Sequence, residues 1–152
     1  MQSVCMGGTF DPFHRGHEAL LQKAIEISQE VLIGLTTDER ATRNRSDSHI
    51  SSYADRKDTL EGWLRSKDAN HRVKIVPLED NWGPAALGEE FDGILVSQET
   101  EKMANRLNQV RKGNGTAPLE VIVIPMVDAY DGGRISSSRI RSGEIDSRGN
   151  KA

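Results

Sequence analysis

The run of residues 3–17, SVCMGGTFDPFHRGH, constrains the fold of this chain more than any other stretch. Residues 4–6 are apolar and predict a short buried strand, which the glycines at positions 7 and 8 are expected to end. Pro12 fixes its own φ and keeps Asp11 out of helical backbone, so a turn is expected at these two residues. The run therefore predicts a strand, a glycine turn and the start of a helix.

An amphipathic run continues from this turn and predicts a helix over residues 16–29. Its apolar residues recur at helical spacing, at Ala19, Leu20, Ala24 and Ile27. The next strand, residues 31–35, is apolar on both sides, as expected for a buried strand of a parallel sheet. Strand, helix and strand together predict a βαβ unit with a right-handed crossover.

The alternation of strands and helices continues along the chain. Further strands are predicted over residues 73–77, 93–96 and 119–125, and further helices over residues 53–66, from 97 to about 112, and from about 136. Ser51 or Ser52 is expected to cap the first of these helices and Ser97 the second, whereas Gly143 ends the third. The fold class is therefore α/β: a doubly wound, Rossmann-like, five-stranded parallel sheet with helices on both faces.

Length and charge bound the domain and its partners. The chain has 152 residues, enough for one domain over residues 1–146, with residues 147–152 as a flexible C-terminal tail. Its formal net charge of −3, with both signs interspersed, gives no pull toward nucleic acid or an anionic membrane. The single cysteine, Cys5, excludes an internal disulfide and is expected in the core. No signal peptide or membrane-spanning run is recognised, so a cytoplasmic protein is expected.

The start of the first expected helix carries groups that suit a bound phosphate. Free N–H groups and a partial positive charge at a helix N-terminus attract anions, and glycines let a phosphate approach the backbone. His14 and His17 lie three residues apart where this helix begins, and both can donate hydrogen bonds to phosphate oxygens. Alone, each is also explained as a capping or packing histidine. Together the groups suit a nucleoside triphosphate.

Two motifs carry a family resemblance. Residues 8–11, GTFD, followed by residues 14–17, HRGH, resemble the GTFD…HxGH signature of the nucleotidyltransferase superfamily. Residues 135–139, ISSSR, resemble its second motif, with Ser138 in place of the usual threonine. Residues 4–146 as a whole resemble the phosphopantetheine adenylyltransferases of the archaeal and eukaryotic type. Further points of likeness are residues 34–39, 77–80, 83–84 and 96–100.

The resemblance implies transfer of AMP from ATP to 4′-phosphopantetheine, which gives dephospho-coenzyme A and pyrophosphate in coenzyme A biosynthesis. Mg²⁺ would accompany ATP, held mainly by phosphate oxygens and water and not by a metal site of the protein. His17 would donate to the α-phosphate and Thr9 would orient the attacking phosphate, as the catalytic residues. ATP-binding residues would be these two with Gly8, Phe10, His14, Ser97, Ser136, Ser137, Ser138 and Arg139. Acceptor-binding residues would be Thr9, Asp11, Arg43, Leu78, Glu79 and Asp80.

Several alternatives stay open. Asp11 is equally explained as a turn-stabilising residue. The loop over residues 36–52 holds Arg40, Arg43 and Arg45 but no lysine, whereas bacterial relatives bind the acceptor with a lysine there; an exposed surface loop is the other interpretation. A different acceptor would make the chain an NMN or FMN adenylyltransferase or a cytidylyltransferase. A non-catalytic nucleotide-binding module is the remaining alternative, and the sequence does not indicate the oligomeric state.

Overall fold

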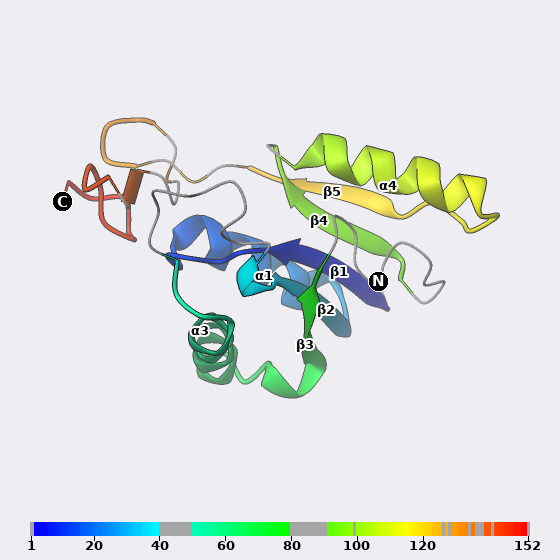
Figure 1. The fold of residues 1–152 in the computed structure, drawn as a ribbon, viewed down its shortest axis with the longest axis horizontal. Helices are drawn as coiled ribbons and strands as arrows, with labels where there is room; N and C mark the ends of the chain where they lie inside the picture. Colours follow the sequence, from blue (N-terminus) through cyan, green and yellow to red (C-terminus); the bar gives the residue numbers. More distant parts are fainter. Residues whose placement is uncertain are drawn as a thin grey trace.

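The computed structural model describes residues 2–39, 50–79, 91–98, 100–125, 127, 129–133, 135, 139–140 and 142–151. Five strands in these ranges form one sheet in the order β3-β2-β1-β4-β5, and all neighbours are parallel (Figure 1). The elements are β1 (Ser3–Gly8), α1 (Arg15–Ile27), β2 (Glu30–Thr36), α3 (Tyr53–Ser66), the 3-10 turn η1 (Asn70–Arg72), β3 (Val73–Leu78), β4 (Gly93–Ser97), α4 (Glu101–Gly113) and β5 (Glu120–Ile124). The predicted doubly wound parallel sheet is confirmed.

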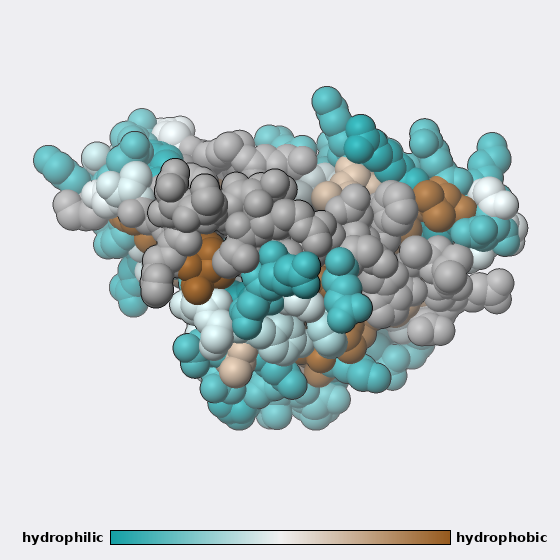
Figure 2. Space-filling model, viewed as in Figure 1, coloured by the Kyte–Doolittle hydropathy of each residue, from teal (hydrophilic) through white to brown (hydrophobic). Residues whose placement is uncertain are grey.

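Helices cover both faces of the sheet, because successive side chains of a strand point to opposite faces. α1 and α3 share one core cluster with Val4 and Met6 of β1. α4 packs on the other face, where Leu107 lies with Cys5, and Figure 1 shows it running along β4 and β5. Burial raises the pKa of the Cys5 thiol to about 12, so this cysteine is the inert core residue predicted. Figure 2 shows hydrophilic side chains over the outward surfaces of α3 and α4.

The prediction that Gly7 and Gly8 end the first strand is wrong. Both belong to β1 and pair with Gly34 and Leu35 of β2. A Cβ at Gly7 would lie 3.1 Å from Cδ2 of Leu78, and one at Gly34 would lie 3.2 Å from Cδ1 of the same residue. The buried Leu78 side chain takes the space next to both glycines, so glycine here reflects close packing inside a strand.

The prediction that Ser97 caps the helix after β4 is also wrong. Ser97 is the last residue of β4, and the N-cap of α4 is Thr100. A tight turn joins them, in which the backbone N–H of Thr100 donates to the Ser97 carbonyl oxygen over 3.1 Å. By contrast, α3 has the predicted bounds, and Oγ of its N-cap Ser52 accepts a hydrogen bond from the backbone N–H of Asp55 over 3.2 Å.

The C-terminal residues return to the start of α1. The carbonyl oxygen of Ser147 accepts a hydrogen bond from the backbone N–H of Arg15 over 3.2 Å, and Ile145 is buried. Gly143, with φ +82°, ends the last helical turn as predicted. These contacts attach the segment to the domain. The domain boundary at residue 146 and a flexible tail over residues 147–152 stay predictions.

Candidate functional site

The carboxyl ends of all five strands meet at one edge of the sheet, where open α/β sheets bind ligands. β1 ends at Gly8, β2 at Thr36 and β3 at Leu78. Thr36 and Leu78 pair with each other in the sheet. The turn of residues 9–14 follows β1 at this edge and leads into α1. The GTFD and HRGH residues therefore follow β1 at this edge, and β1 lies between β2 and β4.

Two histidines cap α1 through each other. His14 is the N-cap, and its Nδ1 atom accepts a hydrogen bond from the backbone N–H of Gly16 over 3.0 Å. In return, Nδ1 of His17 accepts one from the backbone N–H of His14 over 3.2 Å. The two rings stack with their centroids 3.8 Å apart. Because both Nδ1 atoms accept, the proton of each neutral ring is on Nε2, which leaves two Nε2–H donors for a ligand.

Burial sets the charge of this pair. It lowers the pKa of His14 to about 4. For His17, burial and then the charge of His14 lower the pKa to about 3. Both rings are therefore neutral at pH 7 in the ligand-free protein and offer oriented N–H groups. An anion at the Nε2 atoms would raise both pKa values, since a nearby negative charge favours imidazolium.

Aromatic rings hold the His17 imidazole in place. Its centroid lies 5.0 Å from that of Phe10 and 5.7 Å from that of Phe13. Phe10 is buried and has a left-handed backbone, with φ +54°. A Cβ at Gly8 would lie 3.2 Å from the Phe10 ring, so the glycine lets this ring fold back against the strand end. Phe10 therefore positions His17, and direct contact of Gly8 or Phe10 with ATP stays a prediction.

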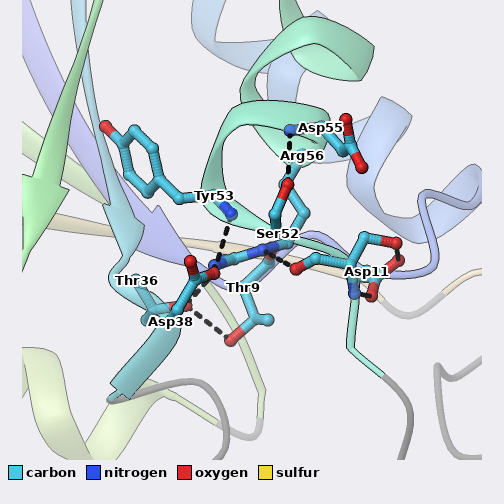
Figure 3. A network of polar contacts seen from close by, with 9 residues as sticks. Thr9, Asp11, Thr36, Asp38, Ser52, Tyr53, Asp55 and Arg56 are labelled. Carbon is cyan, nitrogen blue, oxygen red and sulfur yellow. Dashed lines mark hydrogen bonds and ion pairs between the residues drawn. The ribbon is translucent and has the colours of Figure 1, made fainter.

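Thr9 and Asp11 attach the turn after β1 to neighbouring segments (Figure 3). Oγ1 of Thr36, at the end of β2, donates to Oγ1 of Thr9 over 3.0 Å. Oδ2 of Asp11 accepts a hydrogen bond from the backbone N–H of Ser51 over 2.7 Å, just before α3. This contact fits the turn-stabilising interpretation of Asp11. Ligand contact by Thr9 or Asp11 stays a prediction.

Arg56 is the site residue that the sequence predictions missed. It lies on α3, is 2% exposed, and donates to Oγ1 of Thr36 over 3.1 Å and to the carbonyl oxygen of Thr9 over 3.3 Å. It also donates to Oδ1 of Asp38 over 3.0 Å (Figure 3). A signal existed, because Arg56 precedes the buried Leu60 by four residues and so shares its helix face. The helical period therefore places this arginine on the side of α3 that faces the sheet.

Other predicted residues lie at the same sheet edge or outside the described ranges. Leu78 is buried at the end of β3, and the exposed Glu79 follows it. Ser97 is the carboxyl end of β4. Contact of these three with substrates stays a prediction. Outside the described residues lie Arg43, Asp80, Ser136, Ser137 and Ser138.

Arg139 is paired with two carboxylates. Its Nε atom lies 2.8 Å from Oε2 of Glu144, and its Nη1 atom lies 3.2 Å from Oδ1 of Asp131. The hydrogen bond from Arg139 is the first cause of the lowered pKa of Asp131. Binding of β- and γ-phosphates by Arg139, which stays a prediction, therefore requires an exchange of partners.

Among the described residues, no group of three or more His, Cys, Asp or Glu side chains is arranged to hold a metal ion. In the same part of the chain, no helix is both long and apolar enough to cross a membrane.

The site thus combines the carboxyl edge of an open parallel sheet with a helix that begins at a reciprocal histidine cap, and both histidines belong to the HRGH motif. A family model described as cytidylyltransferase-like matches residues 5–143 of the chain. The chain belongs to this cytidylyltransferase-like family.

Archaeal proteins are similar to the chain over nearly its whole length. It is 42% identical over 145 residues to the phosphopantetheine adenylyltransferase of Methanopyrus kandleri, which covers 95% of this chain and 91% of that protein. It is 44% identical over 146 residues to the phosphopantetheine adenylyltransferase of Methanothermobacter thermautotrophicus, with 96% and 87% covered. A crystal structure of a protein of unknown function from Archaeoglobus fulgidus is similar with a TM-score of 0.70 and 30% identity, over 80% of this chain and 97% of that one.

Proposed function

We propose that the chain is a phosphopantetheine adenylyltransferase, which transfers AMP from ATP to 4′-phosphopantetheine in coenzyme A biosynthesis. The observation that carries the proposal is identity of 42% and 44% to two archaeal proteins of that name over at least 95% of this chain. The intact pair of histidines at the start of α1 supports it. The products are dephospho-coenzyme A and pyrophosphate, and the reaction would take place in the cytoplasm.

The proposed chemistry needs no nucleophile from the protein. An oxygen of the acceptor phosphate attacks the α-phosphorus of ATP, and the bond from that phosphorus to the bridging oxygen of the β-phosphate breaks. The acceptor phosphate is already ionised at neutral pH, so no general base is required. Catalysis then consists of holding the two phosphates in line and stabilising the charge that builds on the α-phosphate oxygens.

The histidine pair suits this task. The Nε2–H of His17 would donate to the α-phosphate as its charge increases, and that of His14 would contact the triphosphate. Each proton is kept on Nε2 because each Nδ1 accepts a backbone N–H. The donors are therefore oriented before ATP binds, which is what electrostatic stabilisation of a transition state requires.

The remaining roles are those that the family resemblance implies. Thr9 would donate to the acceptor phosphate, while the serines at residues 136–138 and Arg139 would bind the β- and γ-phosphates. Ser97 is proposed on the ATP side, and the proposed acceptor side comprises Asp11, Arg43, Leu78, Glu79 and Asp80. Mg²⁺ would arrive with ATP and be held by phosphate oxygens and water.

A turnover screen tests the acceptor. Purified protein is given ATP or CTP with 4′-phosphopantetheine, NMN, FMN or glycerol 3-phosphate, and both pyrophosphate release and the mass of the product are measured. We expect turnover with ATP and 4′-phosphopantetheine, and far less with every other pair. Faster turnover of another acceptor would assign the chain to a different transferase of the family. ATP binding without pyrophosphate release for any acceptor would favour a non-catalytic module.

A further inference from the structure

Arg56 links three segments that are far apart in the sequence. Its Nη1 atom donates to the Thr9 carbonyl oxygen and to the Thr36 hydroxyl, and its Nε atom donates to the carbonyl oxygen of Ser51 over 2.9 Å. Its Nη2 atom lies 3.0 Å from Oδ1 of Asp38. A single buried guanidinium thus joins the turn after β1, the end of β2 and the start of α3.

The guanidinium itself is held from several sides. Asp38 Oδ1 also accepts the backbone N–H of Tyr53 over 2.7 Å, which ties the carboxylate to the first turn of α3 (Figure 3). The Tyr53 ring centroid lies 6.0 Å from Cζ of Arg56. Because its neighbours fix four of its N–H groups, the arginine presents the group that faces Thr36 in one orientation.

The chemistry of arginine fixes which group donates and which accepts in the hydrogen bonds from Arg56 to Thr36 and from Thr36 to Thr9. Arginine has only donors, so the Thr36 hydroxyl must accept from Arg56. A hydroxyl has one hydrogen, and that of Thr36 goes to Oγ1 of Thr9. The Thr9 oxygen accepts this bond, so its own hydrogen is left to donate outward. Thr9 is partly exposed and lies directly before the histidine-capped helix, where the phosphates are proposed to bind.

We infer that Arg56 and Thr36 are positioning residues that orient the Thr9 hydroxyl as a hydrogen-bond donor to the acceptor phosphate. The inference rests on the proposed function, since it assigns Thr9 to the acceptor of that reaction. Arg56 and Thr36 are both buried and act through Thr9, so neither needs to touch the substrate. A role of Arg56 in stability alone is the competing explanation, because a buried charge that loses its partners destabilises a fold.

A double-mutant cycle separates the two explanations. Thr36→Val removes the hydroxyl that donates to Thr9 while keeping the side-chain shape, and Arg56→Lys keeps the charge but not the planar set of donors. We measure kcat and the KM of ATP and of 4′-phosphopantetheine for each variant, alone and combined with Thr9→Val. Each single change should lower kcat/KM for the acceptor by about 10-fold, the loss of one hydrogen bond to a charged group, and change the KM of ATP much less.

The cycle predicts strong non-additivity. Once Thr9→Val has removed the oriented hydroxyl, Thr36→Val or Arg56→Lys should lower acceptor kcat/KM no further. Thr36→Ser, which keeps the hydroxyl, should restore most of the loss. Arg111→Lys is the matched control: Arg111 is 1% exposed in α4 on the opposite face, and its Nε donates to the Ala117 carbonyl oxygen over 2.9 Å. It should lower thermal stability without lowering kcat/KM for the acceptor.

The outcomes distinguish the inference from the proposed function. A wild-type protein that neither binds nor adenylates 4′-phosphopantetheine overturns both. An active wild type whose Thr36→Val and Thr9→Val losses simply add overturns the inference alone, as does a Thr36→Val variant with a normal kcat/KM for the acceptor. If Arg56→Lys does not fold, the cycle of Thr36→Val with Thr9→Val still decides, because Thr36→Val preserves the shape and volume of the buried side chain.

Discussion

His14 and His17 are neutral donors whose tautomers the start of α1 fixes. An exposed histidine would be partly charged near its usual pKa of about 6.5 and free to exchange its proton between two nitrogens. Here burial keeps both rings neutral, and the reciprocal cap keeps each proton on Nε2. In each ring Nδ1 caps the helix, and Nε2 is the nitrogen left for a ligand. At the scale of the residue, capping and ligand binding are therefore not alternatives for these histidines.

His17→Ala is expected to lower kcat by on the order of 10²–10³, the effect of removing one donor to a developing oxyanion. ATP affinity should change much less, because the interaction is strongest in the transition state. Steady-state turnover and calorimetric ATP binding measure the two effects. His71→Ala, at an exposed position in η1, is the control and should leave both unchanged. A loss of ATP affinity as large as the loss of rate would make His17 a ground-state ligand.

Stability should fall as the pH falls from about 6.5 toward about 4. In the unfolded chain the two histidines bind protons below their usual pKa of about 6.5, whereas in the fold they stay neutral until about pH 4 for His14 and about pH 3 for His17. Unfolding therefore takes up protons in this window, and the stability present above pH 6.5 is lost on acidification. Thermal unfolding followed from pH 7.5 to 4.5 measures this loss of stability. His14→Asn, which keeps a capping side chain, should reduce the pH dependence; an equal slope would contradict this origin.

The first turn of α1 requires glycine at position 16. A Cβ there would lie 2.8 Å from Cε1 and 3.0 Å from Nδ1 of His14, whose ring is held by the cap and by stacking on His17. A side chain at position 16 would therefore displace the His14 ring from its capping position. This accounts for the glycine in the HxGH motif by contact with the neighbouring histidine.

Gly16→Ala should weaken ATP binding without stabilising the protein. Alanine in place of glycine favours a helix by about 1 kcal/mol, but the new methyl group displaces His14 and removes a cap worth about as much. Gly62→Ala in α3 is the matched control, because nothing lies within 4 Å of its Cβ position. It should stabilise the protein and leave ATP affinity unchanged. Thermal unfolding and calorimetry compare the two, and normal ATP affinity in Gly16→Ala would show that His14 tolerates the methyl group.

Helices and strands were predictable from the sequence where buried apolar residues follow a regular spacing. The bounds of α3 and the buried parallel strands follow from apolar spacing and the serine cap. The failures at Gly7 and Ser97 have another cause. Leu78, some seventy residues away in sequence, decides that glycine is needed within β1, and the turn to Thr100 decides where α4 begins. Neither contact is visible in a local pattern.

At the scale of the molecule, the histidine pair was predictable because its chemistry lies within one motif of four residues. The network around Arg56 was not, because only the folded sheet brings residues 9, 36, 51 and 56 together. Because the strands are parallel, the ends of β1 and β2 and the start of α3 all lie at the same edge of the sheet. The opposite edge carries the carboxylate of Asp92. There Asp92 accepts the backbone N–H groups of Ser3 and Gln2, which lower its pKa and keep it negative.

ATP should therefore bind at the carboxyl edge and not at the amino edge of the sheet. The start of α1 offers the Nε2–H groups of His14 and His17 to the triphosphate, whereas the ionised Asp92 repels it. We expect Mn²⁺–ATP to broaden the amide NMR signals of Gly8 and Gly16 and to spare those of Gln2 and Gln29 at the amino edge, because a paramagnetic ion relaxes only nearby nuclei. Mg²⁺–ATP gives the reference spectrum, and Mn²⁺ without nucleotide reports binding of the metal alone. Broadening centred on Gln2 that depends on the nucleotide would place ATP at the wrong edge and remove the histidine pair from the site.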